Sequence, residues 1–269
     1  MKLYIQNHSS YKSDIQKDLE IKKTLKQTYK YDTRRQDEFI HLAVYGAKLL
    51  KDKADICEDD ELFVTTGVGN VAVVHKTNTC VYEQNQPLKL FDFINLLGNT
   101  TSYYVASALG IKGKNIFQIS DNFTYINSLI SLYASINNSN KNAILCSIDL
   151  TSSPDEIIKR VLGVDESCNV VSGVSYQKFS LDAQDAMAEL EFESKSYSFD
   201  EIKAYLAQIE SKKVFSPRCI KLDAQKEKTF FFETMAGYVI NDFVSKGEDI
   251  IYVDCFEDRY KILRLKSLR

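Results

Sequence analysis

Few side chains in this sequence could act as a nucleophile, a general base or a metal ligand, and they are widely spaced. His8, His41 and His75 are the three histidines; His41 falls on a predicted amphipathic helix and His75 in a strand-like run, VAVVH. No cysteine pair has the CxxC spacing, and no combination of His, Cys and Asp has the spacing of a zinc site. The GVG turn at 67–69 lacks the third glycine of a dinucleotide-binding loop. We therefore expect no metal and no other cofactor.

The cysteines are the remaining candidate nucleophiles. Several lie within apolar runs, such as AILCSID (143–149) and IIYVDCF (250–256), where a reduced, buried thiol is the expected state. Cys80, Cys146 and Cys255 could each serve as a nucleophile, but no motif places a histidine beside them. The six cysteines are Cys57, Cys80, Cys146, Cys168, Cys219 and Cys255.

Composition and charge limit the class of protein. Of the 269 residues, 44% are hydrophobic and 12% are aromatic, which is enough for a large core and excludes a disordered chain. Lys and Arg number 34 against 37 Asp and Glu, so the net charge of −3 gives no support to nucleic-acid binding. No apolar run approaches the roughly 18 residues of a membrane span, and the opening MKLYIQNHSS has no signal-peptide core. We expect a cytoplasmic protein.

Hydrophobic spacing predicts helices that alternate with buried strands. The clearest unit is a largely apolar helix at 123–136 that leads through a polar turn into an apolar strand at 143–150. The same succession recurs at 233–246 and 249–256. The recurrence indicates a single domain of two related halves, about 1–160 and about 161–269. Further helices are predicted at 39–50, 99–110 and 198–209, and further strands at 3–6, 61–67, 115–120, 185–194 (or a helix at 183–190) and 260–266.

Several segments together resemble the β-ketoacyl synthases of the thiolase-like superfamily. Residues 90–136 are similar to the centre of that family, where a helix leads through a glycine step, matched by Gly110 and Gly113, into a short strand, a nucleophile turn and a buried helix. Other similar segments are 32–50, 61–69, 185–192 and 230–255. The resemblance implies an α/β thiolase-like layered fold, with two related halves and helices buried between sheets, shortened relative to full-length ketosynthases.

The departures from the family bear on activity. The family nucleophile is a cysteine at the start of the buried helix, where unpaired N–H groups stabilise the thiolate. The matching position here is Asn122, and an amide cannot attack a thioester. Two histidines follow the nucleophile in the family and hold the thioester oxyanion. The Pro-His-Gly-Thr motif of the first is absent, and the position of the second falls at about Phe231. The resemblance thus implies no catalytic residue.

Cysteine-less relatives in this family, the chain length factors of type II polyketide and aryl polyene systems, pair with an active ketosynthase. The resemblance therefore implies a non-catalytic heterodimer subunit that helps set chain length and meets the acyl carrier protein only indirectly. The expected interface is the strand before the nucleophile turn, whose apolar side chains would otherwise leave an exposed edge. This strand consists of Asn115, Ile116, Phe117, Gln118 and Ile119.

Several alternatives stay open. Phe123, Tyr125 and Leu129 on the buried helix either bound an acyl tunnel or simply pack in the core. The side chain of Asn122 or Asp121 could cap this helix, since both residue types are good N-caps.

The chain could also belong to another class of protein. One alternative is a stand-alone acyl-thioester enzyme: a decarboxylase using Asn122, or a thioesterase or acyltransferase using Ser120, Cys80 or Cys146. Another is a structural binding protein that retains the fold.

Overall fold

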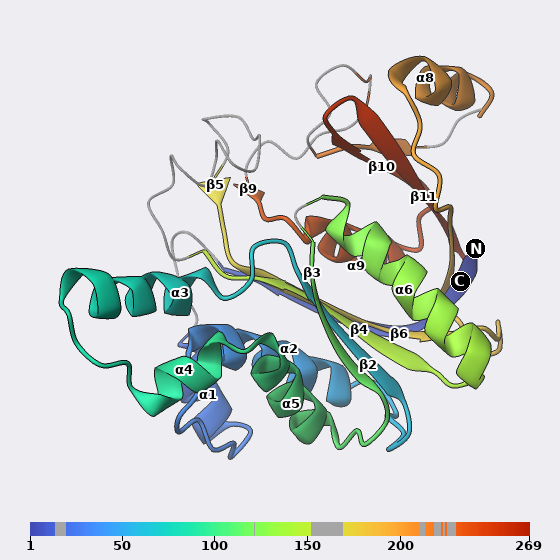
Figure 1. Ribbon diagram of the computed structural model, residues 1–269. Helices are drawn as coiled ribbons and strands as arrows, with labels where there is room; N and C mark the ends of the chain where they lie inside the picture. The colour runs from blue at the N-terminus through green and yellow to red at the C-terminus, as the bar shows by residue number, and fades with distance from the viewer. Residues whose placement is uncertain are drawn as a thin grey trace.

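The fold is that of a computed structural model of the chain, shown in Figure 1. The structure describes residues 1–13, 20–120, 122–151, 169–209, 213–217, 222, 224 and 230–269. In this part of the chain, no helix is both long enough and apolar enough to cross a lipid bilayer.

Nine strands form one mixed sheet. They are β1 (Lys2–Lys12), β2 (Glu61–Thr66), β3 (Asn115–Ile119), β4 (Ala143–Asp149), β6 (Gly173–Ser180), β7 (Ala188–Phe192), β8 (Lys213–Phe215), β10 (Ile250–Phe256) and β11 (Arg259–Ser267). Their order is β3-β2-β4-β6-β1-β7-β11-β10-β8. A separate parallel pair joins β5 (Asn169–Val170) to β9 (Phe230–Phe231).

The order of the strands divides the sheet into two similar groups. β1 and β7 pair antiparallel at the junction, with Leu3 opposite Leu190. Outward from β1 come β6, β4, β2 and β3, and outward from β7 come β11, β10 and β8. In each group the first two steps are antiparallel and the next is parallel. Strand β6 pairs with β1 and β4 and so belongs to the first group. In the sequence, the first group therefore ends at Ser180, later than the boundary at about residue 160 that the sequence predicts.

Helices cover both faces of each group of strands. They are α1 (Ile21–Gln27), α2 (Glu38–Lys51), α3 (Val71–Asn78), the π-helical turn η1 (Thr79–Glu83), α4 (Leu90–Leu96), α5 (Gly98–Leu109), α6 (Thr124–Ser139), α8 (Phe199–Ala207) and α9 (Met235–Lys246). α6 and α9 pack together with apolar side chains from both strand groups. α2 and α5 cover the outer face of the first group, and α8 covers that of the second (Figure 1). The predicted arrangement, two helices buried between layers of strands, is confirmed.

The structure corrects several predictions about single elements. The run VAVVH belongs to helix α3, so the strand-like interpretation of His75 is wrong. The first strand extends to Lys12, and a further helix, α4, precedes the predicted helix at 99–110. Strand β7 confirms the strand at 185–194, and helix α8 confirms the helix at 198–209, with Ser198 as its N-cap in a capping box. The fully buried strand β6 has no counterpart among the predictions.

Candidate functional site at the start of helix α6

The turn that leads into α6 contains a strained residue. Phe123 is the N-cap of the helix, and its backbone has φ 47° and ψ 33°, the left-handed region that large side chains seldom adopt. Outliers of this kind cluster at functional sites. Because Phe123 takes the cap position, the prediction that Asn122 caps α6 is wrong. Asp121, the other residue proposed as a cap, lies outside the described residues.

Hydrogen bonds hold this turn together. The Ser120 hydroxyl donates to the Asn122 carbonyl at 2.9 Å. The Asn127 side-chain amide donates to the same carbonyl at 2.9 Å and to the Ser120 hydroxyl oxygen at 3.3 Å. The Thr124 hydroxyl donates to the Ser120 carbonyl. The partners of the Ser120 hydroxyl are thus a carbonyl and an amide, neither of which can act as a general base.

A buried lysine faces the same turn from the second group of strands. Lys261 on β11 is 7% exposed. Its Nζ lies 3.3 Å from Asn127 Oδ1, 3.2 Å from the Ser194 carbonyl oxygen and 5.7 Å from the centre of the Phe123 ring. Burial lowers the pKa of Lys261, and the nearby carboxylate of Asp254 acts in the opposite sense. Lys261 and Asp254 thus place charges of opposite sign beside the start of α6.

Helix α9 begins against a buried carboxylate. Asp149, at the end of β4, accepts hydrogen bonds from Thr66 Oγ1 (2.9 Å), Gly67 N (2.9 Å) and Thr234 N (2.7 Å). Burial raises the pKa of Asp149, although these donors favour the charged form. Gly67 is required, because a Cβ there would lie 2.0 Å from Glu233 Cγ. The Asp149 carboxylate thus occupies the position at the N-terminus of α9 where an anion could bind.

The structure places the predicted tunnel and histidine positions in the core. Phe123, Tyr125 and Leu129 are all buried, and Tyr125 and Leu129 pack between the two groups of strands. Burial raises the pKa of Tyr125 well above its ordinary value. Phe231 is a buried residue of β9, and its carbonyl accepts a hydrogen bond from Val171 N at 3.0 Å. These side chains fill the interior between the layers.

The thiols of the described residues have their contacts elsewhere. Cys146 points to the face covered by α2 and α5, and burial raises its pKa to about 12, which makes it inert. Cys255 packs with the cluster beneath α8. Cys80 Sγ lies 3.8 Å from the carbonyl oxygens of Gln86 and Pro87. Cys57 is exposed before β2, and Cys168 and Cys219 lie outside the described residues.

The imidazoles are also remote from the turn. His8 Nε2 lies 3.4 Å from Ser245 Oγ, near the end of α9. His41 Nε2 lies 3.2 Å from the Thr33 carbonyl oxygen, and His75 is on α3. The described contacts therefore bring no imidazole to the start of α6.

The predicted interface strand is an edge strand. Among the described strands, β3 is the last of the sheet and pairs only with β2. Its Ile119 side chain is 60% exposed. The strand continues into an apolar surface on the segment 68–103: Gly98 lies against the Phe117 ring, and Gly69 lies close to Ile119. The exposed apolar side chains of this segment are Val68, Val74, Val81, Tyr82, Leu90, Phe91, Phe93, Leu97 and Tyr103.

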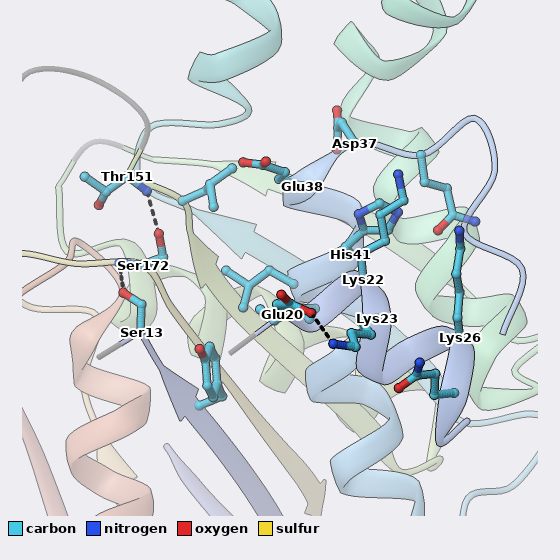
Figure 2. Close-up of a pocket in the computed structure, with 16 residues that line it drawn as sticks. Ser13, Glu20, Lys22, Lys23, Lys26, Asp37, Glu38, His41, Thr151 and Ser172 are labelled. Carbon is cyan, nitrogen blue, oxygen red and sulfur yellow. Dashed lines mark hydrogen bonds and ion pairs between the residues drawn. The ribbon is translucent and has the colours of Figure 1, made fainter. Parts of the chain in front are cut away.

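A separate hollow of about 770 Å³ lies beside α1 and the start of α2 (Figure 2). Lysines and carboxylates share its wall: Lys23 forms an ion pair with Glu20 at 2.9 Å, and Asp37 accepts a hydrogen bond from Ile40 N at 2.9 Å. His41 lines it, and burial lowers the pKa of this imidazole. The opposite charges compensate one another, so the hollow selects neither an anion nor a cation.

One group of side chains has the spacing of metal ligands. Cys57, Asp59 and Asp60 bring a ligand atom each within 4.8 Å of one another. Lysines already neutralise both carboxylates, because Lys178 Nζ lies 3.3 Å from Asp60 and Lys141 Nζ lies 3.3 Å from Asp59. This group of side chains therefore does not support a metal site.

No family model and no curated protein matches the sequence, so the comparison with known proteins is one of folds. Among solved structures, the ishigamide ketosynthase/chain length factor superposes over 100% of both chains with a TM-score of 0.72 and 11% sequence identity. The chain has the thiolase-like fold. The resemblance predicted from the sequence is thus confirmed at the level of the fold.

Two further structures with the thiolase-like fold are similar over almost their whole length. The ketosynthase ApeO in complex with its chain length factor ApeC from Xenorhabdus doucetiae has a TM-score of 0.61 and 8% identity, covering 98% of this chain and 99% of that one. A type II polyketide acyl-carrier protein in complex with its ketosynthase, AntDE:AntF, has a TM-score of 0.65 and 11% identity, covering 99% of each chain.

Proposed function

We propose that this chain is a non-catalytic, ketosynthase-like subunit of the chain length factor type, which pairs with an active β-ketoacyl synthase. The partner condenses acyl groups carried on an acyl carrier protein, and this chain stabilises it and helps to limit the length of the product. The observation that carries the proposal is the start of α6. Where the fold family has a thiolate, this chain has Asn122 and a strained Phe123.

The chemistry available around this turn supports a silent subunit. Thioester attack requires a thiolate or an activated hydroxyl beside a base. The described thiols and imidazoles have their contacts elsewhere, and Ser120 is engaged with Asn122 and Asn127. At α9, Asp149 takes the N–H of Thr234, so this donor is not open to an oxyanion. Binding and shaping remain as the roles that the site can perform.

The edge of the sheet supports the pairing. β3 presents an unpaired backbone edge with the exposed side chain of Ile119, and edges of this kind invite another strand. The adjoining segment 68–103 adds aromatic and aliphatic side chains, among them Phe93 and Leu97. Apolar patches of this extent on a protein surface mark interaction sites. A ketosynthase that presents its own equivalent strand would cover both features.

The packing of α6 indicates where chain length would be set. Tyr125 and Leu129 are fully buried among core side chains. An acyl chain has no room beside them without displacing that packing. We therefore assign the limit on length to the surface shared with the ketosynthase and not to a tunnel inside this subunit.

Co-expression tests the pairing. A ketosynthase encoded beside this chain should co-elute with it in a one-to-one complex when only this chain carries an affinity tag. Ile119→Asp places a charge on the exposed side chain of the proposed interface strand and should reduce recovery of the partner about tenfold. Leu268→Asp, at an exposed apolar residue after β11, should leave recovery unchanged. Equal recovery with both variants, or a soluble monomer that never binds the partner, would contradict the proposal.

A further inference from the structure

Most of the exposed apolar side chains near β3 lie on an arm of the chain, residues 70–97, which consists of α3, η1 and α4 (Figure 1). The structure describes the whole arm. Val73 and Asn95 are buried, and every other residue of the arm is half-buried or exposed. One buried apolar side chain contributes only about 2 kcal/mol, far less than the entropy lost on ordering a segment of this length. The contacts at the two ends of the arm therefore matter for its orientation.

Polar contacts join both ends of the arm to the loop before α2. At its start, Asn70 Nδ2 donates to Asp37 Oδ2 at 2.6 Å and lies 3.4 Å from the Asn95 carbonyl oxygen. At its end, Asn95 Nδ2 lies 3.4 Å from the Arg35 carbonyl oxygen. Asp37 is itself fixed as the N-cap of α2, where it accepts a hydrogen bond from Ile40 N at 2.9 Å. The two ends of the arm thus meet at this loop, with the Asp37 carboxylate as the charged partner.

The same loop also contacts α4. The Arg35 guanidinium lies over the Phe91 ring, 4.8 Å from its centre. On α4 and its C-cap, the exposed residues Leu90, Phe93 and Leu97 follow one another at spacings of three and four, so they share one face of the helix. A contact that fixes the arm against the loop therefore also fixes the direction in which this apolar face points.

We propose that Asp37 and Asn70 position the interface: the hydrogen bond between them holds the arm so that the apolar face of α4 and the edge strand β3 are presented together to a partner. The identity of that partner, an active ketosynthase, rests on the proposed function. A hydrogen bond to a charged group contributes about 1.5–3 kcal/mol, and this one links the arm to a helix that packs in the core. Both residues act through the arm and are therefore positioning residues.

Hydrogen exchange measured by mass spectrometry on the full chain alone tests the bond. Asn70→Ala removes the donor, so the amides of 71–97 should exchange about tenfold faster, whereas those of α6 should not change. Asp37→Asn keeps an N-cap residue and an uncharged acceptor, so its effect should be smaller. Lys76→Ala, the matched control, breaks the ion pair with Asp92 (2.6 Å) inside the arm and should exchange as the wild type does, because pairs with an exposed partner contribute little. Equal exchange in Asn70→Ala and the wild type would overturn the proposal.

Co-purification with the ketosynthase tests the positioning. Asn70→Ala should recover about threefold less partner than the wild type, because only chains with a correctly placed arm can bind. Lys76→Ala should recover as much as the wild type. Faster exchange in Asn70→Ala together with full recovery of the partner would overturn the positioning role. A wild type that recovers no ketosynthase would contradict the proposed function instead, and the exchange experiment would still decide whether the bond between Asp37 and Asn70 holds the arm.

Discussion

The two central helices, α6 and α9, lie in the same layer but begin in different electrostatic surroundings. The N-cap residue of α9, Thr234, donates its backbone N–H to the Asp149 carboxylate at 2.7 Å. The first turn of α6 meets an ammonium, that of Lys261, and starts from the left-handed backbone of Phe123. The start of α9 thus contacts a carboxylate through its backbone, whereas the start of α6 contacts a lysine and, through the Thr124 hydroxyl, the Glu233 carboxylate.

The two polar groups differ in how much of the fold they hold together. Asp149 joins the ends of β2 and β4 to α9, so its role is to hold the layers together. Lys261 contributes less to the fold, because its hydrogen bonds go to two neutral oxygens, those of Asn127 and Ser194. Replacing Asp149, beside α9, should therefore lower the free energy of unfolding strongly, and replacing Lys261, beside α6, should lower it only weakly.

The largest expected effect is on the α9 side. Asp149→Ala leaves two backbone N–H groups and the Thr66 hydroxyl buried without an acceptor. We expect a loss of about 4 kcal/mol in the free energy of unfolding, measured by urea denaturation. Asp149→Asn keeps the volume and one acceptor oxygen, so it should lose less. A loss below about 1 kcal/mol in Asp149→Ala would be close to the uncertainty of such measurements. It would contradict a structural role for this carboxylate.

A pH effect should arise at the far end of α9, beside Ser245. Burial, with the positive charges of Lys53 and Arg269, lowers the pKa of His8 from 6.5 to about 4. The folded protein therefore binds this proton less readily than the unfolded chain, so stability is full above pH 6.5 and falls as the pH drops toward 4. At pH 5 the loss should be about 2 kcal/mol.

His8→Gln should remove this part of the acid sensitivity. Urea denaturation at pH 7 and pH 5 measures it, as the difference between the wild type and the variant. His41, whose pKa burial also lowers, titrates in both proteins and cancels in the comparison. Identical pH dependence in the two proteins would show that His8 is not held neutral.

The smallest effect concerns the close contact between α9 and β6. A Cβ on Gly237 would lie 2.3 Å from Ser175 Oγ and 3.0 Å from the Tyr125 ring. Gly237→Ala should destabilise the protein by about 1 kcal/mol, because the clash exceeds the gain in helix propensity. Adding Ser175→Ala removes the nearest atom and should restore most of the loss in thermal unfolding. A stabilising Gly237→Ala would show that the helix can move away from the strand.

The elements predicted best from the sequence are those with a strong, local hydrophobic pattern. The helices α2, α5, α6 and α9 repeat apolar residues at helical spacing, the strands β2, β4 and β10 lie in continuous apolar runs, and Ser198 forms a capping box with Glu201. Local pattern sufficed there because the pattern itself determines which face is buried.

The elements that were missed depend on partners far away in the sequence. β6 (GVSYQKFS) looks too polar for a core strand, but Gln177 donates to Asn241 Oδ1 at 2.8 Å and Lys178 pairs with Asp60. In α3, a β-branched run at 71–75 favours a strand, and tertiary context overrides it.

The start of the buried helix was predicted more closely than the groups that surround it. Counting from the glycine step located Asn122 beside the actual N-cap, Phe123. Lys261 could not be assigned to this turn, because it comes from a strand more than a hundred residues away and a lysine in an alternating strand is expected to face solvent. The same holds for Asp149 and Thr234, whose contact joins the end of β4 to the start of α9.

Intact-mass spectrometry on the purified complex tests the central claim most directly. After incubation with an acyl-loaded carrier protein, the account predicts an acyl adduct on the ketosynthase and none on this chain. An adduct on this chain that survives in the complex, and that maps to any of its thiols or to Ser120, would contradict it.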